Sequence, residues 1–461
     1  MLAFLLAWLT FAAGGVYFWV WVPCAAALLV MMLATRPMIG SDTRTRPLDA
    51  ALCLSMLVPA VQLIPLPAPV LLQLAPDALV LRARLRLMPI ASSDTLYLPV
   101  SIVPAYTAEA LVIFAAAVAT YWIARDICER GGAGRLVRSI AFIGLGASVA
   151  AIVQQTESPA LLYGIWKPQD AGARPYGPFV NRNHFATWMI MAAPLVFGYL
   201  LARAPTRPER GYSPRLATAL KQLGTVRIWL VTAVCVMALA VLISASRSGL
   251  IAMTAALAVT GSVGMFRFRA ATKAHSGEGA GGSVVRWTMF QAVMLAAVVV
   301  SFGNFGTVLA RIDETLAAAG AGRGRVAVWR DTLLLIHDFA VTGTGAGTFG
   351  AAVPAYQTAA PGYSIGHAHN HYLQVAAEGG MLLTVALALV ACAFVYAVAG
   401  RSKQDRSPGL LIRVGATAGL GAVMLQSIWE TGLRMPANAM LCGIMAAIAT
   451  HAVRSSPHAT D

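Results

Sequence analysis

Charged residues are scarce in this chain of 461 residues. They make up 11% of the sequence, whereas a soluble domain carries roughly 25%. Acidic residues are the rarest, with 19 Asp and Glu against 34 Lys and Arg, while hydrophobic residues make up 58% of the chain. This composition excludes an ordinary soluble domain and is typical of an integral membrane protein that crosses the bilayer many times.

The chain also lacks the patterns that usually hold metal ions. No DxD motif occurs, which argues against a metal-dependent nucleotide-sugar transferase. The cysteines show no CxxC spacing and are scattered in or beside apolar segments, so they suggest packing residues, and neither a disulfide framework nor a zinc site. They are Cys24, Cys53, Cys128, Cys235, Cys392 and Cys442.

Apolar runs of about 20 residues, long enough to cross a bilayer as helices, dominate the chain. The first is short, and we interpret it as a retained helix because no Lys or Arg precedes it. The predicted fold is all-α, a polytopic integral membrane protein with about 12 transmembrane helices in a single domain over 1–461. The segments are 2–13, 16–34, 48–64, 107–124, 136–155, 183–202, 228–245, 249–266, 287–308, 372–398, 412–429 and 437–453.

Basic residues predict the orientation of these helices, because Lys and Arg collect on the cytoplasmic side. With both termini inside, the cytoplasmic segments carry 22 basic residues and the other side carries 12, which together are all 34. The net charge of +15 is therefore mostly an anchoring signal, since nucleic-acid binders group their basic residues on one soluble face. This topology places a large outer loop at 309–371, between the ninth and tenth helices, and we expect no nucleic-acid partner.

Four polar clusters then lie on the outer side. Arginine forks suit phosphate oxygens, because two donors meet two acceptors, and imidazole transfers protons near neutral pH. An outer cavity with both would bind a lipid-linked phosphate and deprotonate a hydroxyl. The clusters are RPYGPFVNRNHF with Arg182, Asn183 and His184; SASRSG with Arg247; GRGRVAVWRD with Arg325, Trp329 and Arg330; and HAHNHYLQ with His369 and Asn370.

Several of these features allow a second interpretation. Arg247 is costly near bilayer depth unless it is paired or lines a water-filled cavity, but it could instead be an anchor that snorkels to the interface. The string GAGTFG fits a GxGxxG nucleotide pattern, yet no strand-like run leads into it, which favours a tight turn. HAHNH spells HxHxH, although residues two apart on a helix point away from each other, so we assign no metal. The amphipathic segment 65–106 is an interfacial helix or a lid over a lipid.

Several of these motifs resemble those of a known family. HNHYLQVAAEGGMLL, beginning at His369 and Asn370, is similar to the hallmark of the O-antigen ligase and polysaccharide polymerase superfamily: His, then Asn, Ser or Gln, nine residues, and a glycine, here Gly380. Leu383 departs from the hallmark's last position, which is Gly, Thr or Tyr. GRGRVAVW followed by FAVTGTGAGTFG resembles the family's Arg-x-x-x-Trp and glycine-rich pair, and SASRSG and GPFVNRNHFATW also recur in such proteins.

The resemblance implies a glycosyltransferase without cofactor or metal, in the bacterial inner membrane with its active site facing the periplasm. Its donor would be a glycan on undecaprenyl pyrophosphate, and its acceptor hydroxyl would lie on another repeat unit or on lipid A core. His369 would be the base or orienter of that hydroxyl, while Arg325 and Arg247 would hold the pyrophosphate. The products would be surface polysaccharides such as O-antigen, capsule or exopolysaccharide.

Two choices stay open at this level. Because Leu383 departs from the ligase hallmark, we lean slightly towards a polymerase over a ligase. A transporter or flippase of lipid-linked glycans is the alternative of another class, for which twelve spans are typical. Transporters place ionisable groups at the midplane of broken helices, whereas here the polar residues gather at one face.

Overall fold

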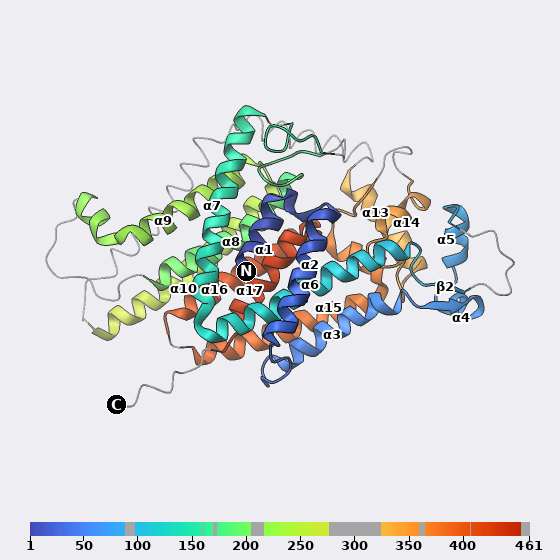
Figure 1. Ribbon diagram of the computed structural model, residues 1–461, viewed down its shortest axis with the longest axis horizontal. Coiled ribbons are helices and arrows are strands. Elements are labelled where there is room, and N and C mark those ends of the chain that lie inside the picture. Colours follow the sequence, from blue (N-terminus) through green and yellow to red (C-terminus); the bar gives the residue numbers. More distant parts are fainter. Residues whose placement is uncertain are drawn as a thin grey trace.

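The chain folds mostly into helices, as the computed structural model shows in Figure 1. It describes residues 1–87, 97–158, 160–168, 173–203, 216–275, 324–358, 365–405 and 407–452. The prediction of an all-helical chain is confirmed, apart from a two-stranded antiparallel sheet within the described residues. The predicted segment 287–308 lies outside the described residues, as do 309–323 and 359–364 of the predicted outer loop.

Proline residues occur both inside the long helices and at their starts. Pro23, Pro59 and Pro194 lie inside them, and Pro at the first turn, where no N–H partner is lost, begins α3, α6 and α17. These helices are α1 (Leu2–Phe11), α2 (Phe18–Thr35), α3 (Arg46–Val61), α6 (Pro104–Ile127), α7 (Ala133–Glu157), α8 (Arg182–Ala202), α9 (Leu216–Ile243), α10 (Arg247–His275), α15 (His371–Gln404), α16 (Gly409–Gln426) and α17 (Pro436–Thr450).

The shorter elements join these helices or cover one end of the bundle. They are η1 (Ala13–Gly15), β1 (Pro65–Pro67), α4 (Ala68–Leu74), α5 (Ala78–Arg84), β2 (Tyr97–Pro99), η3 (Cys128–Gly132), α13 (Arg325–Asp338), α14 (Phe349–Ala352), η4 (Val353–Ala355) and η5 (Gly432–Arg434).

Every predicted span that falls in the described residues coincides with a helix. Seven helical stretches there are long and apolar enough to cross a membrane, and one of them, Pro104–Glu157, contains both α6 and α7. Leu2–Phe11 and Pro436–Thr450 are apolar but shorter, and α3 has 16 residues. The chain is therefore a multi-pass membrane protein, while twelve crossings remain a prediction.

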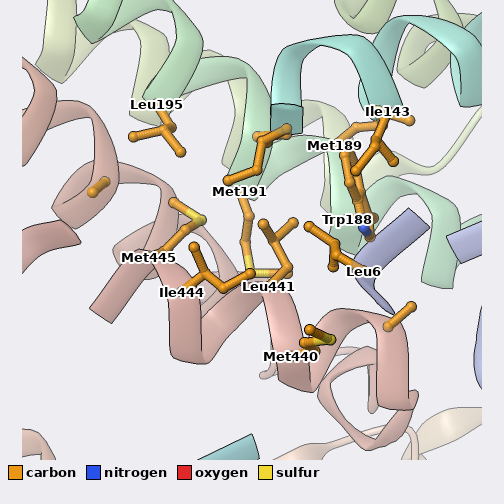
Figure 2. Packing of buried hydrophobic residues seen from close by; sticks show 14 of the residues in the cluster. Leu6, Ile143, Trp188, Met189, Met191, Leu195, Met440, Leu441, Ile444 and Met445 are labelled. Carbon is orange, nitrogen blue, oxygen red and sulfur yellow. The ribbon is translucent and has the colours of Figure 1, made fainter. Parts of the chain in front are cut away.

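Helix α8 is the central helix of the bundle. Its side chains are buried from His184 to Tyr199. Figure 2 shows Trp188, Met189 and Met191 of this helix among Leu6 of α1, Ile143 of α7 and residues of α17. A helix that is apolar on all sides, as this one is, belongs inside a bundle. The start of α8, which carries three predicted site residues, is thereby held on a rigid element.

Close contact between α8 and α16 fixes two site elements relative to each other. The glycines of a GATAG stretch in α16 lie against the α8 backbone, where a Cβ on Gly419 would be 2.7 Å from the Met191 carbonyl oxygen. A Cβ on Gly415 would meet the carbonyl oxygen of Pro194. Small residues let membrane helices approach in this way. The close approach sets the α16–α17 loop beside the beginning of α8.

A second glycine contact breaks α15 near its start. Gly380 has φ 60° and ψ −161°, and a Cβ there would strike the carbonyl oxygen of Val341. The loop that follows α13 pairs with this break, because Met381 N–H donates to Ala340 O at 2.7 Å and Gly345 N–H donates to Glu378 O at 2.9 Å. The glycine of the hallmark is thus required where two backbones touch.

A small apolar core outside the main bundle joins segment 65–103 to α13 and α14. These elements lie together at the right of Figure 1. The two-stranded sheet pairs Pro65 with Pro99. Arg82 is 2% exposed, and its guanidinium donates to backbone carbonyls, among them Ser101 O at 2.9 Å. Residues of the segment 65–106 therefore pack against α13, the helix that carries Arg325. That this segment acts as a lid stays a prediction. The core contains Leu71, Leu81, Val100, Ile102, Leu335, Phe339, Phe349 and Ala377.

Candidate active site

The histidine-rich segment 365–371 forms the entry to α15. Asn370 caps the helix, with its Oδ1 accepting a hydrogen bond from the Leu373 N–H at 3.1 Å. His369 has φ 51°, which is unusual for a residue other than glycine. Strained backbones of this kind cost about 1–3 kcal/mol and persist mainly at functional sites. The predicted pair His369 and Asn370 therefore lies in a turn that the cap and its surroundings hold in place.

Helix α13 is attached to this segment. The indole N–H of Trp329 donates to the carbonyl oxygen of Ala368 at 3.0 Å. Arg325 lies four residues earlier, on the same face of the helix. Because the Trp329 bond holds this face against segment 365–371, Arg325 lies near His369, and its guanidinium lowers the pKa of that imidazole. Arg325, Trp329 and His369, which the sequence separates by up to 44 positions, are thus neighbours.

A buried glutamate that the sequence analysis missed holds Arg325. Glu430, in the loop between α16 and α17, is 3% exposed and accepts a hydrogen bond from Arg325 Nη2 at 2.6 Å. It also accepts one from Asn183 Nδ2 at 2.7 Å. Burial raises the pKa of Glu430, and the charges of Arg325 and Arg182 oppose that shift. Three residues predicted for the site, Arg182, Asn183 and Arg325, therefore converge on one carboxylate.

Four imidazoles, those of His184, His367, His369 and His371, form an electrostatically coupled group. Burial first, and the charge of Arg325 second, lower the pKa of His369 to about 4. Burial, Arg434 and the neighbouring imidazoles of His184, His369 and His371 lower the pKa of His367 to about 3. Both imidazoles are neutral at pH 7 and can accept a proton.

Three buried imidazole nitrogens in the cluster lack a partner in the described part of the chain. They are the Nδ1 atoms of His184, His367 and His371. His184 is held by its backbone, because Asn438 Nδ2 donates to its carbonyl oxygen at 3.1 Å. Buried polar atoms are normally satisfied by hydrogen bonds. Unpaired nitrogens in a group therefore mark a place where a polar ligand can bind.

A second buried glutamate, Glu378, lies in α15, after its first residue His371 and before the break at Gly380. Arg434 Nη1 donates to it at 2.7 Å and Gln374 Nε2 at 3.0 Å. The backbone N–H groups of Gly347 and Phe349 donate to the same carboxylate, at 2.8 and 3.3 Å. The GAGTFG string is thus a turn that binds an internal carboxylate. This supports the turn interpretation over the nucleotide site.

Two predicted arginines are less closely tied to the cluster. Arg247 is the first residue of α10 and is exposed, and the start of α10 packs on α8, where a Cβ on Gly249 would be 2.7 Å from Ala186 Cβ. It therefore begins its helix near the same end of α8 as Asn183. Arg330 is exposed on α13, and among the described residues none forms an ion pair with it.

Among the described residues, no three His, Cys, Asp or Glu side chains are arranged to hold a metal ion. In the HxHxH stretch, His371 begins α15, whereas His367 and His369 precede it. Whether the reaction needs a metal is a separate question, and metal independence remains a prediction.

Residues 232–388 match the family model described as O-antigen ligase. The match covers Arg247, α13, the glycine-rich loop and the histidine segment, and it supports the O-antigen ligase-like superfamily for this chain. The resemblance seen in the sequence is thereby confirmed. No curated protein matches the chain.

The matched family suggests a membrane enzyme of the O-antigen ligase or polymerase type, a class that takes a lipid-linked glycan donor and a glycan acceptor. Asn183, Glu430 and Arg434 lie outside the matched residues. Side-chain contacts connect all three to the site, and no local pattern in the sequence indicates Glu430 or Arg434.

Proposed function

We propose that this protein transfers a glycan from undecaprenyl pyrophosphate to an acceptor hydroxyl at the periplasmic face of the bacterial inner membrane. The observation that carries the proposal is that the Trp329–Ala368 hydrogen bond holds the helix face of Arg325 against the segment of His369, a half-buried imidazole that is neutral at pH 7. One group suits an anionic leaving group and the other suits the proton of a hydroxyl. The family match to O-antigen ligase supports the same class of reaction.

The reaction assigns a role to each group. His369 takes the proton from the acceptor hydroxyl, whose oxygen forms the new bond to the anomeric carbon of the donor. The bond between that carbon and the pyrophosphate breaks, and undecaprenyl pyrophosphate leaves with the electron pair. Arg325 and Arg247 stabilise its developing charge, which is the usual task of preorganised cations at a leaving group.

Other residues of the cluster bind substrate in this proposal. Arg182, Asn183 and Arg330 contact polar groups of the donor, while His184 and Asn370 border the acceptor. Trp329 provides an aromatic face as well as its hydrogen bond to the histidine segment. Since arginines neutralise the leaving group, the reaction proceeds without a metal, and purified enzyme should keep its activity in EDTA.

The low pKa of His369 fits a general base whose pKa rises when the substrate binds. A general base works best when its pKa lies near the working pH, and a pKa of about 4 makes a weak one. When a diphosphate binds Arg325, its negative charge offsets the guanidinium that lowers this pKa. Donor binding therefore raises the pKa of His369, so the imidazole becomes a stronger base once the donor is in place.

The acceptor distinguishes two activities of the same site. The matched family is described as O-antigen ligase, whereas Leu383 departs from the ligase hallmark, so we retain a slight lean towards a polymerase of lipid-linked repeat units. Leu383 is 8% exposed and packs beside Gly379 at the break of α15. A deletion strain separates them, because loss of a polymerase leaves single repeat units and loss of a ligase leaves long chains on the carrier lipid.

Substitution of His369 by alanine tests the proposal. The purified variant should transfer glycan about 10²–10⁴-fold more slowly than the original protein, which is the contribution of general-base catalysis. Binding of undecaprenyl pyrophosphate should persist, since the arginines are unchanged. Transfer at a near-normal rate would refute the role of His369. Transport of donor across vesicles without any glycosyl transfer would favour the flippase alternative.

A further inference from the structure

We propose that Glu430 is the positioning residue for Arg325, holding one edge of its guanidinium so that the rest faces the diphosphate of the donor. The inference rests on the proposed function, because it assigns Arg325 to the leaving group. It adds a residue outside 232–388, in a loop that the family match does not cover. Glu430 acts through Arg325 and touches no reacting atom.

The Arg325 guanidinium has one edge that is bonded to Glu430 and a second edge that is not. The Arg325 side chain is 41% exposed, whereas that of Glu430 is 4% exposed. A guanidinium has five N–H donors in one plane, and among the described residues the contact that orients Arg325 uses its Nη2. Nη1 and Nε form no hydrogen bond with the described residues, and because the side chain as a whole is 41% exposed, phosphate oxygens can approach these donors.

Glu430 is itself held from several sides. Asn183 Nδ2 donates to it at 2.7 Å from the start of α8. Its loop is attached to α15 at two points, through the hydrogen bond from His371 N–H to Ser427 O at 2.8 Å and the ion pair of Arg434 with Glu378 at 2.7 Å. Substrate-binding groups gain affinity when their supporting residues fix them in advance. The α16–α17 loop provides that support for Arg325.

A competing role for the same carboxylate is that of a stand-in for the diphosphate, which would have to leave Arg325 before the donor binds. Two observations oppose this. Glu430 is buried, and it is bonded to a residue of the central helix that would lose its partner if the carboxylate moved. The two roles predict opposite effects of neutralising Glu430, so a binding measurement separates them.

The first experiment is a double-mutant cycle on donor-lipid binding. E430Q, R325A and the double variant are purified in nanodiscs, and the Kd for undecaprenyl pyrophosphate is measured. Glutamine keeps an oxygen that can accept from both Arg325 and Asn183 but removes the charge. We expect E430Q to weaken binding about tenfold when Arg325 is present and less than about twofold in the R325A background, because coupled residues are not additive.

A second measurement follows Arg325 itself and needs no substrate. The rate at which phenylglyoxal modifies Arg325, determined by mass spectrometry, should rise in E430Q because the guanidinium is released from its partner. D126N is the matched control, since it removes the remote ion pair of Asp126 with Arg130. It should leave both the modification rate and the Kd unchanged.

Each outcome decides between the roles. An equal loss of binding in both backgrounds would mean that Glu430 acts on structure in general, and tighter binding by E430Q would mean that it competes with the diphosphate. Either result overturns the inference. If the original protein fails to bind undecaprenyl pyrophosphate, the proposed function is refuted, and the modification rate alone then tests Glu430: faster modification supports its hold on Arg325, and an unchanged rate refutes it.

Discussion

Replacing Arg325 by glutamine should raise the pKa of His369. Burial and the guanidinium together bring that pKa from 6.5 to about 4, with burial the larger cause. Removal of the charge therefore recovers less than half of this interval, and the pKa in the variant should stay nearer 4 than 6.5. The direction follows because a nearby cation disfavours the imidazolium, so its loss favours protonation.

The pKa can be measured without any turnover. Diethyl pyrocarbonate modifies the neutral imidazole, so the rate of modification of His369 at each pH, resolved by tandem mass spectrometry, gives its titration curve. The matched control is R330Q on the same helix, because Arg330 is exposed and is not among the charges that shift His369. In that variant the pKa should remain at the original value.

Two results would refute the reasoning. A pKa that stays the same or falls in R325Q would mean that Arg325 does not lie beside His369. A pKa near 6.5 in the original protein would mean that water solvates the imidazole freely. The same coupling predicts the pH profiles of the active enzyme: the acid limb of kcat, which reports the complex, should lie at higher pH than that of kcat/KM, which reports the free enzyme.

Three further predictions concern the leaving group, the topology and the fold. R325K and R247K should transfer glycan nearly as slowly as the alanine variants, because lysine lacks the planar pair of donors; full activity of the lysine forms would show that charge alone suffices. A cysteine at the exposed Val326 should react with an impermeant maleimide from the periplasmic side of intact cells, and labelling only after lysis would reverse the predicted topology. G380A should fail to accumulate as folded protein, because the added Cβ would strike the backbone of Val341. G421A is the control and should be purified normally, because a Cβ there meets nothing within 4 Å. Equal yields of the two variants would contradict the contact at α15.

The helices were predictable from the sequence because their cause is local. Apolar runs such as 183–202 and 372–398 are long enough to satisfy their backbone groups within one helix, and α8 and α15 cover them. The start of α15 was predictable only in part. A resemblance to a family motif indicated His369 and Gly380, but it could not reveal that Gly380 interrupts the helix to contact Val341.

Glu430 could not be predicted because its contacts are distant in the chain. It meets Arg325 across 105 positions and Asn183 across 247. Hydropathy periods report which face of one helix is buried, but they carry no information about which helices meet. Acidic residues are rare in this sequence, yet the fold brings two of them, Glu430 and Glu378, to the polar clusters.

The glycine-rich string GAGTFG binds an anion as a nucleotide-binding turn would, but the anion is not a nucleotide. Backbone N–H groups in a tight turn bind anions, and GAGTFG does so through Gly347 and Phe349. The anion is the carboxylate of Glu378 from the same chain. A nucleotide pattern in sequence thus reports the ability of a turn to bind negative charge, and the identity of the anion depends on what the fold places there.

Charge balance explains how arginines and histidines can share one buried region. Arg182 and Arg325 face the carboxylate of Glu430, which leaves an excess of positive charge where the proposed diphosphate would bind. Arg434 is neutralised by Glu378. Because His367 and His369 stay neutral well below pH 7, they add no further repulsion to these cations. Burial thus keeps the imidazoles able to accept a proton and leaves the arginines as the charges that select an anionic donor.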